Sequence, residues 1–496
     1  LGLALWSFFA SLWIYLPKLR GWPALGAVLI VWLALSGAPD HSLRDTTYKD
    51  DAALQKPPLA GHFEQWRATT LPDAEKSPIF LVAAAGGGLR AAFWTANLLA
   101  AMDDATCGQF GRHVYAYSGV SGGSLGVAAY LAQRQVWEAK RDLRERCAQG
   151  RREEITRMLG RDFLAPVAGS TIFAELAHRL LHIPLDNERG TALAKSWSSA
   201  WDDVFGPDHV VRFDARFLEV FSALPSGTRD GVTAPAVFFN ATSVDSGRRV
   251  VSTNVKIRDA DVPGSVDLHR ESPWVALKTA GLRLREAVLN SARFTYVSPA
   301  GTVYACYRPA AVRDENGNEV RPPALDQHGK CEPDREKIWD RVVDGGYFEN
   351  SGLATLMDVV HFLMPSNPAA ADDEIRKSRQ LRSRVYIIVI DNSSEPELAC
   401  PPSGWQRPVR TDVRTAELSR TAGLAAPIEA LLNVREAHAR LEVRRARLAF
   451  KCPRHLIDWS LLGAREEQLE ARQARQQPAL GWFLSTRSAI WMLSRV

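Results

Sequence analysis

A serine framed by glycines stands between a predicted strand and a predicted helix. The segment Gly119-Val-Ser121-Gly122-Gly123 follows the strand candidate at 113–118 and leads into a long helical pattern. In a sharp turn of this kind the serine hydroxyl can act as a nucleophile, and glycines tolerate the unusual backbone angles that the turn requires. The helix after the serine would direct free N–H groups and its positive dipole end at developing negative charge. Ser121 is therefore the candidate nucleophile, supported by its neighbouring glycines.

A second glycine-rich turn could stabilise the negative charge that such a nucleophile creates. Gly86-Gly87-Gly88-Leu-Arg90 follows the apolar run at 79–85 and opens another helical pattern. Backbone N–H groups at a strand-to-helix turn form a nest that binds anions, which would make Gly86, Gly87 and Gly88 an oxyanion hole. Arg90 either supports this loop or adds positive charge near a phosphate. The alternative is that the three glycines only form a tight turn.

The candidate base is an aspartate in a third turn, Val343-Asp344-Gly345-Gly346-Tyr347. Its carboxylate follows a short apolar run and lies on an uncrowded turn, so it can face the serine. A free aspartic acid has a pKa of about 4 and is a weak base at neutral pH, but burial beside an apolar acyl site would raise that pKa and improve proton abstraction. Asp-Gly-Gly alone is an ordinary turn sequence, so this assignment depends on the other two motifs.

These three turns need a scaffold that brings them together. The pattern alternates strand, helix, strand and helix from residue 79 to about residue 147, and further strand candidates lie at 236–240, 249–253, 341–343 and 384–390. Such alternation predicts an α/β fold with a parallel sheet that helices cover on both faces. Ligands of such sheets bind at the carboxyl ends of the strands, where all three turns are expected.

Taken together and in this order, the glycine loop, the serine turn and the later Asp-Gly-Gly resemble the patatin-like phospholipase family. Two segments between the motifs add to the resemblance. Val237–Thr242 with the turn Asp245–Arg248 is similar to the family's central strand and turn, and Ala287–Ala292 is similar to its helix before the aspartate. The resemblance extends over about residues 78–358.

This resemblance implies a three-layer αβα sheet that carries a serine acyl hydrolase of the phospholipase or lysophospholipase type. By the same resemblance, Ser121 and Asp344 form a catalytic dyad without histidine, and Gly87 and Gly88 supply oxyanion N–H groups. It further implies a lipid or phospholipid acyl ester as substrate, with no cofactor and no metal. The long stretch at 151–235 and the tail beyond residue 391 are not set by the family pattern, so acyl-chain and headgroup preference stay open.

Two uncharged apolar segments, Leu1–Pro17 and Trp22–Ala38, precede all of these motifs. Each is close to the length of about 17 to 20 residues that a helix needs to cross a bilayer core, and a short basic turn separates them. We therefore expect a transmembrane hairpin at 1–38 and anchoring in a bacterial inner membrane, with a buried helical hairpin as the alternative. Lys and Arg on the two flanks nearly balance, so the positive-inside rule does not orient the hairpin. The absence of an initiator Met indicates a fragment.

The rest of the chain divides into three expected parts. A polar, proline-rich linker at 39–77 leads to a catalytic domain at 78–400, which contains a helical insertion at 151–235. A helical C-terminal extension at 401–496 is expected to pack on the catalytic domain. The extension is rich in arginine: Arg435, Arg440, Arg444, Arg445 and Arg447. A solvated helix face is the simpler explanation of these arginines, and contact with anionic lipid headgroups is the functional one.

The six cysteines fall into pairs that are close in sequence: Cys107 with Cys147, Cys306 with Cys331, and Cys400 with Cys452. Such pairs are compatible with disulfides in an oxidising compartment, although six cysteines are also ordinary for a reduced protein of this length. These pairs favour a location of the catalytic domain on the periplasmic side of the membrane. The cysteines and histidines show no spacing typical of a metal site.

The charge of the chain argues against nucleic acid as a partner. The 61 basic and 56 acidic residues give a formal charge of +5 and are interspersed along the chain. A nucleic-acid-binding domain usually concentrates its basic residues on one face or in one block. The expected partners are therefore a lipid substrate and a membrane, and the oligomeric state stays open.

One alternative is an α/β-hydrolase with a Ser-His-Asp triad. Its base would come from His361, His438 or His455, which follow Asp344 in the expected chain order. Only a single predicted helix separates the two glycine turns, which is less secondary structure than that fold normally places there. His361 and His438 also lie within helical patterns, which favours structural roles.

Two further alternatives belong to other functional classes. Gly86-x-Gly88-x-x-Ala91 matches a dinucleotide-binding loop, yet the second strand ends in the serine turn where that motif needs an acidic residue for the ribose. A non-catalytic membrane scaffold of the same fold is the other alternative. The joint presence of serine, aspartate and glycine loop disfavours it.

Overall fold

The computed structural model describes most of the chain beyond its N-terminal segment. The described residues are 7, 11, 41–43, 46–48, 56–139, 147, 148, 150–181, 188–207, 211–222, 232–269, 275–294, 297–309, 312–313, 319–320, 324–326, 328–365, 372–392, 422–450, 454–460 and 484–493. Within these ranges, no helix has both the length and the apolar character needed to cross a bilayer. The hairpin expected at 1–38 lies outside them, apart from Ser7 and Ser11.

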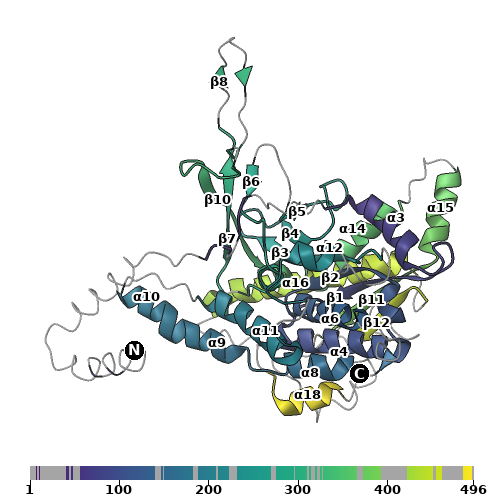
Figure 1. Cartoon of the computed structure of the whole chain (residues 1–496), viewed down its shortest axis with the longest axis horizontal. Coiled ribbons are helices and arrows are strands. Elements are labelled where there is room, and N and C mark those ends of the chain that lie inside the picture. The colour runs from purple at the N-terminus through teal and green to yellow at the C-terminus, as the bar shows by residue number, and fades with distance from the viewer. Residues whose placement is uncertain are drawn as a thin grey trace.

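A sheet of ten strands forms the centre of the described structure (Figure 1). Its order is β12-β11-β1-β2-β3-β10-β7-β6, with β4 beside β3 and β5 beside β4. The strands are β1 (Ile79–Ala84), β2 (Val114–Val120), β3 (Ala236–Ser243), β4 (Arg249–Thr253), β5 (Ser265–Asp267), β6 (Val275–Leu277), β7 (Gly301–Tyr307), β10 (Glu336–Asp344), β11 (Val385–Asp391) and β12 (Leu456–Ser460). A separate ribbon of β8 (Val312–Arg313) and β9 (Glu319–Val320) projects at the top of Figure 1.

The sheet is mixed, which corrects the expectation of a parallel sheet. Strands β12, β11, β1, β2 and β3 are parallel neighbours. In contrast, β4 and β10 pair antiparallel with β3, and β7 pairs antiparallel with β10. A parallel connection needs roughly a dozen or more residues. The short turn between Ser243 and Arg249 is far below that length, so β4 must return as a hairpin.

Helices cover both faces of the sheet (Figure 1). They are α3 (Leu59–Thr70), α4 (Gly88–Thr106), α5 (Gln109–Arg112), α6 (Gly122–Glu138), α8 (Arg151–Leu159), α9 (Leu164–Gly169), η2 (Ser170–Glu175), α10 (Leu176–Leu181), α11 (Arg189–Phe205), α12 (Phe217–Ser222), α13 (Leu284–Ser291), η3 (Gly345–Tyr347), α14 (Leu353–Leu363), α15 (Asp372–Arg382), α16 (Ala422–Ala449) and α18 (Thr486–Leu493). The elements from α8 to α12 lie in the stretch where helices are expected from the sequence.

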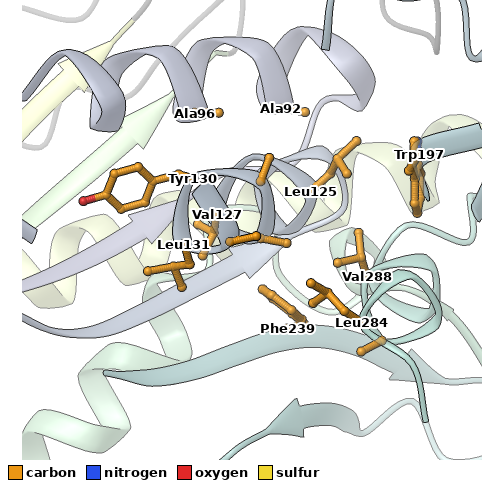
Figure 2. Close-up of a cluster of buried hydrophobic side chains, with 14 of the residues drawn as sticks. Ala92, Ala96, Leu125, Val127, Tyr130, Leu131, Trp197, Phe239, Leu284 and Val288 are labelled. Carbon is orange, nitrogen blue, oxygen red and sulfur yellow. The ribbon is translucent and has the colours of Figure 1, made fainter. Parts of the chain in front are cut away.

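Alternate side chains of β1 enter two separate cores. Val82 and Ala84 belong to a cluster with α4, α6, α11 and α13, part of which is drawn in Figure 2. Ile79, Leu81 and Ala83 belong to a second cluster with α3, α14 and α16. Successive strand residues point to opposite faces, so the sheet is buried between two helical layers. The predicted three-layer α/β arrangement is confirmed.

The segment predicted as a linker contains a helix that is folded onto the domain. Helix α3 buries Leu59, Phe63 and Trp66, and the two aromatic rings contact Tyr115 of β2. These apolar residues recur with the period of an amphipathic helix. The prolines on both sides suggest turns, but residues 59–70 between them form this helix. The helix belongs to the folded domain rather than to a tether.

The C-terminal extension is not helical throughout, contrary to expectation. After α16 the chain returns to the sheet as β12, which pairs in parallel with β11. Leu456 of β12 is fully buried, and Ile457 and Trp459 pack against the core. This short apolar strand pairs with the outer edge of β11, whose backbone N–H and C=O groups would otherwise be unpaired.

Residues 41–43 run beside β7, in parallel with it. The Thr302 N–H donates to the His41 carbonyl at 2.9 Å, and the two segments are bridged in parallel. Strand β7 is antiparallel to β10, with Gly301 paired to Val342. Residue 41 therefore lies toward the end of the sheet at which β10 terminates in Asp344, and residue 43 lies away from it.

Candidate active site

Ser121 occupies the turn between the end of β2 and the start of α6. Its backbone angles are φ 52° and ψ −122°, in a region that residues with a side chain rarely adopt. Among the described non-glycine residues only Cys107 shares a positive φ. The Ser121 N–H donates to Oγ of Ser291 on α13 at 3.0 Å, which holds the turn from outside. Strain of this kind persists where surrounding contacts enforce it, and it often marks a functional site.

Glycines next to Ser121 allow the serine turn and the glycine loop to touch. A Cβ at position 122 would lie 1.8 Å from the carbonyl oxygen of Gly88, and one at position 123 would lie 2.3 Å from that of Ala84. A Cβ at position 119 would lie 2.6 Å from Cα of Ser124. All three approaches are too close for any larger residue. The predicted supporting role of Gly119, Gly122 and Gly123 thus has a packing reason.

This close packing gives a prediction for Gly122→Ala. The added methyl group must push the serine turn away from the glycine loop, and overpacking of this kind costs about 1 to 3 kcal/mol. We expect a lower melting temperature and at least tenfold lower acyl-ester hydrolysis. Gly61→Ala is the matched control, because a Cβ there meets nothing within 4 Å in helix α3. A Gly122→Ala protein that melts and reacts like Gly61→Ala would contradict this account of the turn.

Asp344 ends β10 and is held on several sides. Its N–H donates to the Arg293 carbonyl at 3.0 Å, and its carbonyl accepts from Oγ1 of Thr242 at 2.9 Å. Its Oδ1 accepts from the Gly346 N–H at 2.7 Å. Ser121 lies near enough to this carboxyl group for its hydroxyl to lower the pKa of Asp344. The structure therefore places the candidate nucleophile and the candidate base near each other.

The surroundings of Asp344 favour its role as a base. Its side chain is only 2% exposed, and this burial raises the pKa of Asp344 above its ordinary value of 3.8. The Ser121 hydroxyl, the positive charge of Arg435 and the Gly346 N–H each lower that pKa and so oppose burial. A carboxylate with a raised pKa accepts a proton more readily than a solvated aspartate.

The glycine loop offers two free N–H groups. Gly86 is not one of them, because its N–H donates to the Asn350 carbonyl at 2.9 Å. Gly87 and Gly88 have φ values of 152° and 61°, which only glycine adopts readily. Over the described ranges, the N–H groups of Gly87 and Gly88 have no hydrogen-bond acceptor within the protein. These two groups remain the candidate oxyanion donors.

Arg90 supports the loop through an asparagine that the sequence did not single out. Its Nε donates to Oδ1 of Asn392 at 3.3 Å, and Nδ2 of Asn392 donates to the Gly86 carbonyl at 3.0 Å. Arg90 is buried, and this burial lowers its pKa. Of the two roles considered for Arg90, the structure shows the supporting contact.

A buried polar network connects β3 to the serine turn. Oγ of Ser291 donates to the Asn240 carbonyl at 2.6 Å, and Nδ2 of Asn240 donates to the Gly119 carbonyl at 2.8 Å. Oγ1 of Thr355 donates to Oδ1 of Asn240 at 2.6 Å. In the sequence, Asn240 and Ser291 stand out only because they belong to two segments that resemble a family pattern. Their contacts give both residues a structural reason to be there.

The candidate histidines of a triad have other hydrogen-bond partners or are exposed. Nδ1 of His438 is hydrogen-bonded to the Phe348 carbonyl, and Nδ1 of His455 to the Val385 carbonyl. His361 is exposed on α14. Among the described residues, the groups that lower the pKa of Asp344 are Ser121, Arg435 and the Gly346 N–H, and none of them is a histidine. Across the described ranges, His, Cys, Asp and Glu side chains form no cluster that could hold a metal ion.

The chain was compared with known proteins. Neither a family model nor a curated sequence matches it. Solved structures that resemble it include human GIVD cytosolic phospholipase A2, with TM-score 0.37 and 12% identity over 88% of this chain and 63% of that chain. VipD from Legionella pneumophila has TM-score 0.26 and 11% identity over 84% of this chain and 66% of that chain. This chain thus spans less than two thirds of either one, and the likeness to both is remote.

Proposed function

We propose that this chain is a serine acyl hydrolase that cleaves lipid acyl esters, of the phospholipase or lysophospholipase type. One observation carries the proposal: the hydroxyl of Ser121, in its strained turn, lies near enough to the buried carboxyl of Asp344 to lower the pKa of that group. Gly88, whose N–H is free within the described protein, lies against the turn that holds this serine. An alcohol, a buried base and unpaired N–H donors in one place are the parts that acyl transfer requires.

In the proposed reaction, Oγ of Ser121 attacks the ester carbonyl carbon while Asp344 takes the hydroxyl proton. The carbonyl oxygen becomes an oxyanion, and the N–H groups of Gly87 and Gly88 stabilise it. Collapse of this intermediate breaks the ester bond, and the leaving alcohol takes the proton back from Asp344. Water then attacks the acyl-serine with Asp344 again as base, which releases a carboxylic acid and restores Ser121.

Lipid is the proposed substrate class for two reasons. The ordered motifs resemble those of patatin-like phospholipases, and the apolar segments at 1–38 have the composition of a membrane anchor. Residue 41 lies toward the end of the sheet that carries Asp344. A membrane anchor at 1–38 would therefore hold the active-site end of the domain close to the bilayer.

Hydrolysis by the purified full-length chain tests this proposal. The substrates are a phospholipid, a lysophospholipid, a triacylglycerol and a water-soluble nitrophenyl ester, and released fatty acid is measured by mass spectrometry. We expect release from at least one lipid and none from the same lipid with the Ser121→Ala variant. Hydrolysis of the nitrophenyl ester alone would contradict lipid as the substrate class. No hydrolysis of any ester would favour a non-catalytic scaffold.

We also propose that the catalytic domain works in an oxidising compartment, on the periplasmic side of a bacterial inner membrane. Cys107 is bonded to Cys147, and Cys306 to Cys331. The third expected pair, Cys400 with Cys452, lies outside the described residues. Disulfides persist mainly where thiols are not kept reduced.

Peptide mapping tests the compartment. Free thiols in the membrane-bound protein are alkylated during cell lysis, and the protein is then digested without reduction. We expect linked peptides that join Cys107 to Cys147 and Cys306 to Cys331. Complete alkylation of all four cysteines would mean that the domain faces a reducing compartment.

A further inference from the structure

Helix α16 brings an arginine into the proposed active site from the C-terminal part of the chain. Nη2 of Arg435 donates to Oδ1 of Asn350 at 2.8 Å. Cζ of Arg435 also lies 3.3 Å from the position that a Cβ on Gly346 would take. The Gly346 N–H is itself bound to Oδ1 of Asp344 at 2.7 Å. The guanidinium therefore lies against the turn that holds the candidate base.

Asn350 links this arginine to the glycine loop as well. Its backbone carbonyl accepts the Gly86 N–H at 2.9 Å. Its Oδ1 would lie 2.5 Å from a Cβ on Gly86, which places the Asn350 side chain directly beside the loop. Arg435 of α16 thus contacts Asn350, which holds the glycine loop. The same arginine also lies beside the turn that holds Asp344.

We propose that Arg435 is a positioning residue of the active site, which fixes Asn350 against the glycine loop and places a positive charge beside the turn that carries Asp344. This inference rests on the proposed acyl-hydrolase function. Its consequence is that the C-terminal helix completes the active site. From the sequence, the arginine-rich segment is interpreted either as a solvated helix face or as a contact with lipid headgroups. Neither interpretation gives Arg435 a role in the active site.

Among the described residues, Arg435 supplies the charge that lowers the pKa of Asp344. Burial raises the pKa of Asp344, and the positive charge of Arg435 opposes that rise. Ionisable groups on neighbouring elements are bound elsewhere, as the following contacts show. Arg293, beside α13, donates to the Asn290 side chain and the Pro299 carbonyl. Glu349 accepts the backbone N–H groups of Ser351 and Ala354, and Asp340 of β10 accepts from the Ser243 hydroxyl. On α16, His438 is hydrogen-bonded to the Phe348 carbonyl, and Glu442 forms an ion pair with Arg445.

The test compares the pH dependence of kcat/KM in three variants. Arg435→Gln removes the charge, so the pKa of Asp344 should rise and the acid limb should move to higher pH by about one unit or more. This corresponds to roughly tenfold lower kcat/KM on the limb, with recovery toward the wild-type value on the plateau. Arg435→Lys keeps the charge and should keep the limb. Arg445→Gln, an exposed charge on the same helix, should behave like wild type.

Three results would overturn the role of Arg435. An unchanged profile in Arg435→Gln would mean that it does not act on Asp344. An equal loss at every pH, with the limb in place, would mean that it only holds the fold. A higher KM for phospholipid but not for an uncharged ester, again with the limb in place, would make it a phosphate contact. Failure of the proposed function itself would be seen separately, as equal activity in wild type and Ser121→Ala.

Discussion

Ser121→Ala is expected to lower kcat/KM for acyl-ester hydrolysis by roughly 10³-fold or more, while leaving the fold intact. The substitution removes the only atom that can form the acyl-enzyme at this turn, and loss of a catalytic nucleophile has effects of this size. The bond that holds the turn, from the Ser121 N–H to Ser291, is made by the backbone and survives the substitution. Initial rates at several substrate concentrations measure the loss.

The control for this variant is its stability. We expect the melting temperature of Ser121→Ala to stay close to that of the wild type, because alanine can take the same backbone conformation at similar cost. An inactive variant that is also unfolded would require Ser121→Cys, which keeps a nucleophilic side chain, as a second test. Activity near the wild-type level in folded Ser121→Ala would mean that another residue is the nucleophile.

Asp344→Asn is expected to lower kcat/KM by roughly 10²- to 10⁴-fold, the range that general-base catalysis supplies. The amide keeps the shape of the carboxyl group but cannot take the proton of Ser121. In the wild type, activity should rise with pH through the pKa of Asp344, because only the ionised carboxyl accepts a proton. Burial places that limb above the ordinary value of 3.8. In Asp344→Asn this limb should be absent.

Histidine variants provide the opposite outcome. Single substitutions of His361, His438 and His455 by alanine should leave hydrolysis within a few fold of wild type. Loss of activity in one of them, with folding intact, would replace the dyad by a triad. An Asp344→Asn protein that keeps most of its activity and its acid limb would mean that another group is the base.

The local parts of the site could be predicted from the sequence because each one depends on a few adjacent residues. An apolar run followed by glycines marks the end of a buried strand, and this signal located Ser121, Asp344 and the loop at Gly87 and Gly88. Their proximity could be inferred only from the order of the motifs. The structure brings the two residues near each other because strands β2 and β10 both border β3.

The rest depends on contacts between distant parts of the chain. Arg435 and Asn350 are 85 positions apart, and Arg90 and Asn392 are 302 positions apart. An arginine that enters a site from another helix has the same sequence pattern as one on a solvated face. The antiparallel half of the sheet was missed for a similar reason, since a strand carries no mark of its direction. The sequence also suggests Gly86 as a donor. Its N–H is in fact bonded to the Asn350 carbonyl, and a partner so far along the chain cannot be identified from the local sequence.

Labelling with a fluorophosphonate probe tests the dyad most directly, because it needs no knowledge of the natural substrate. The full-length protein is incubated with the probe, digested, and analysed by mass spectrometry for the modified residue. We expect a single adduct on Ser121, much slower labelling in Asp344→Asn, and none in Ser121→Ala. An adduct on another residue, or no adduct on folded wild-type protein, would contradict the assignment of Ser121 and Asp344 as the catalytic pair.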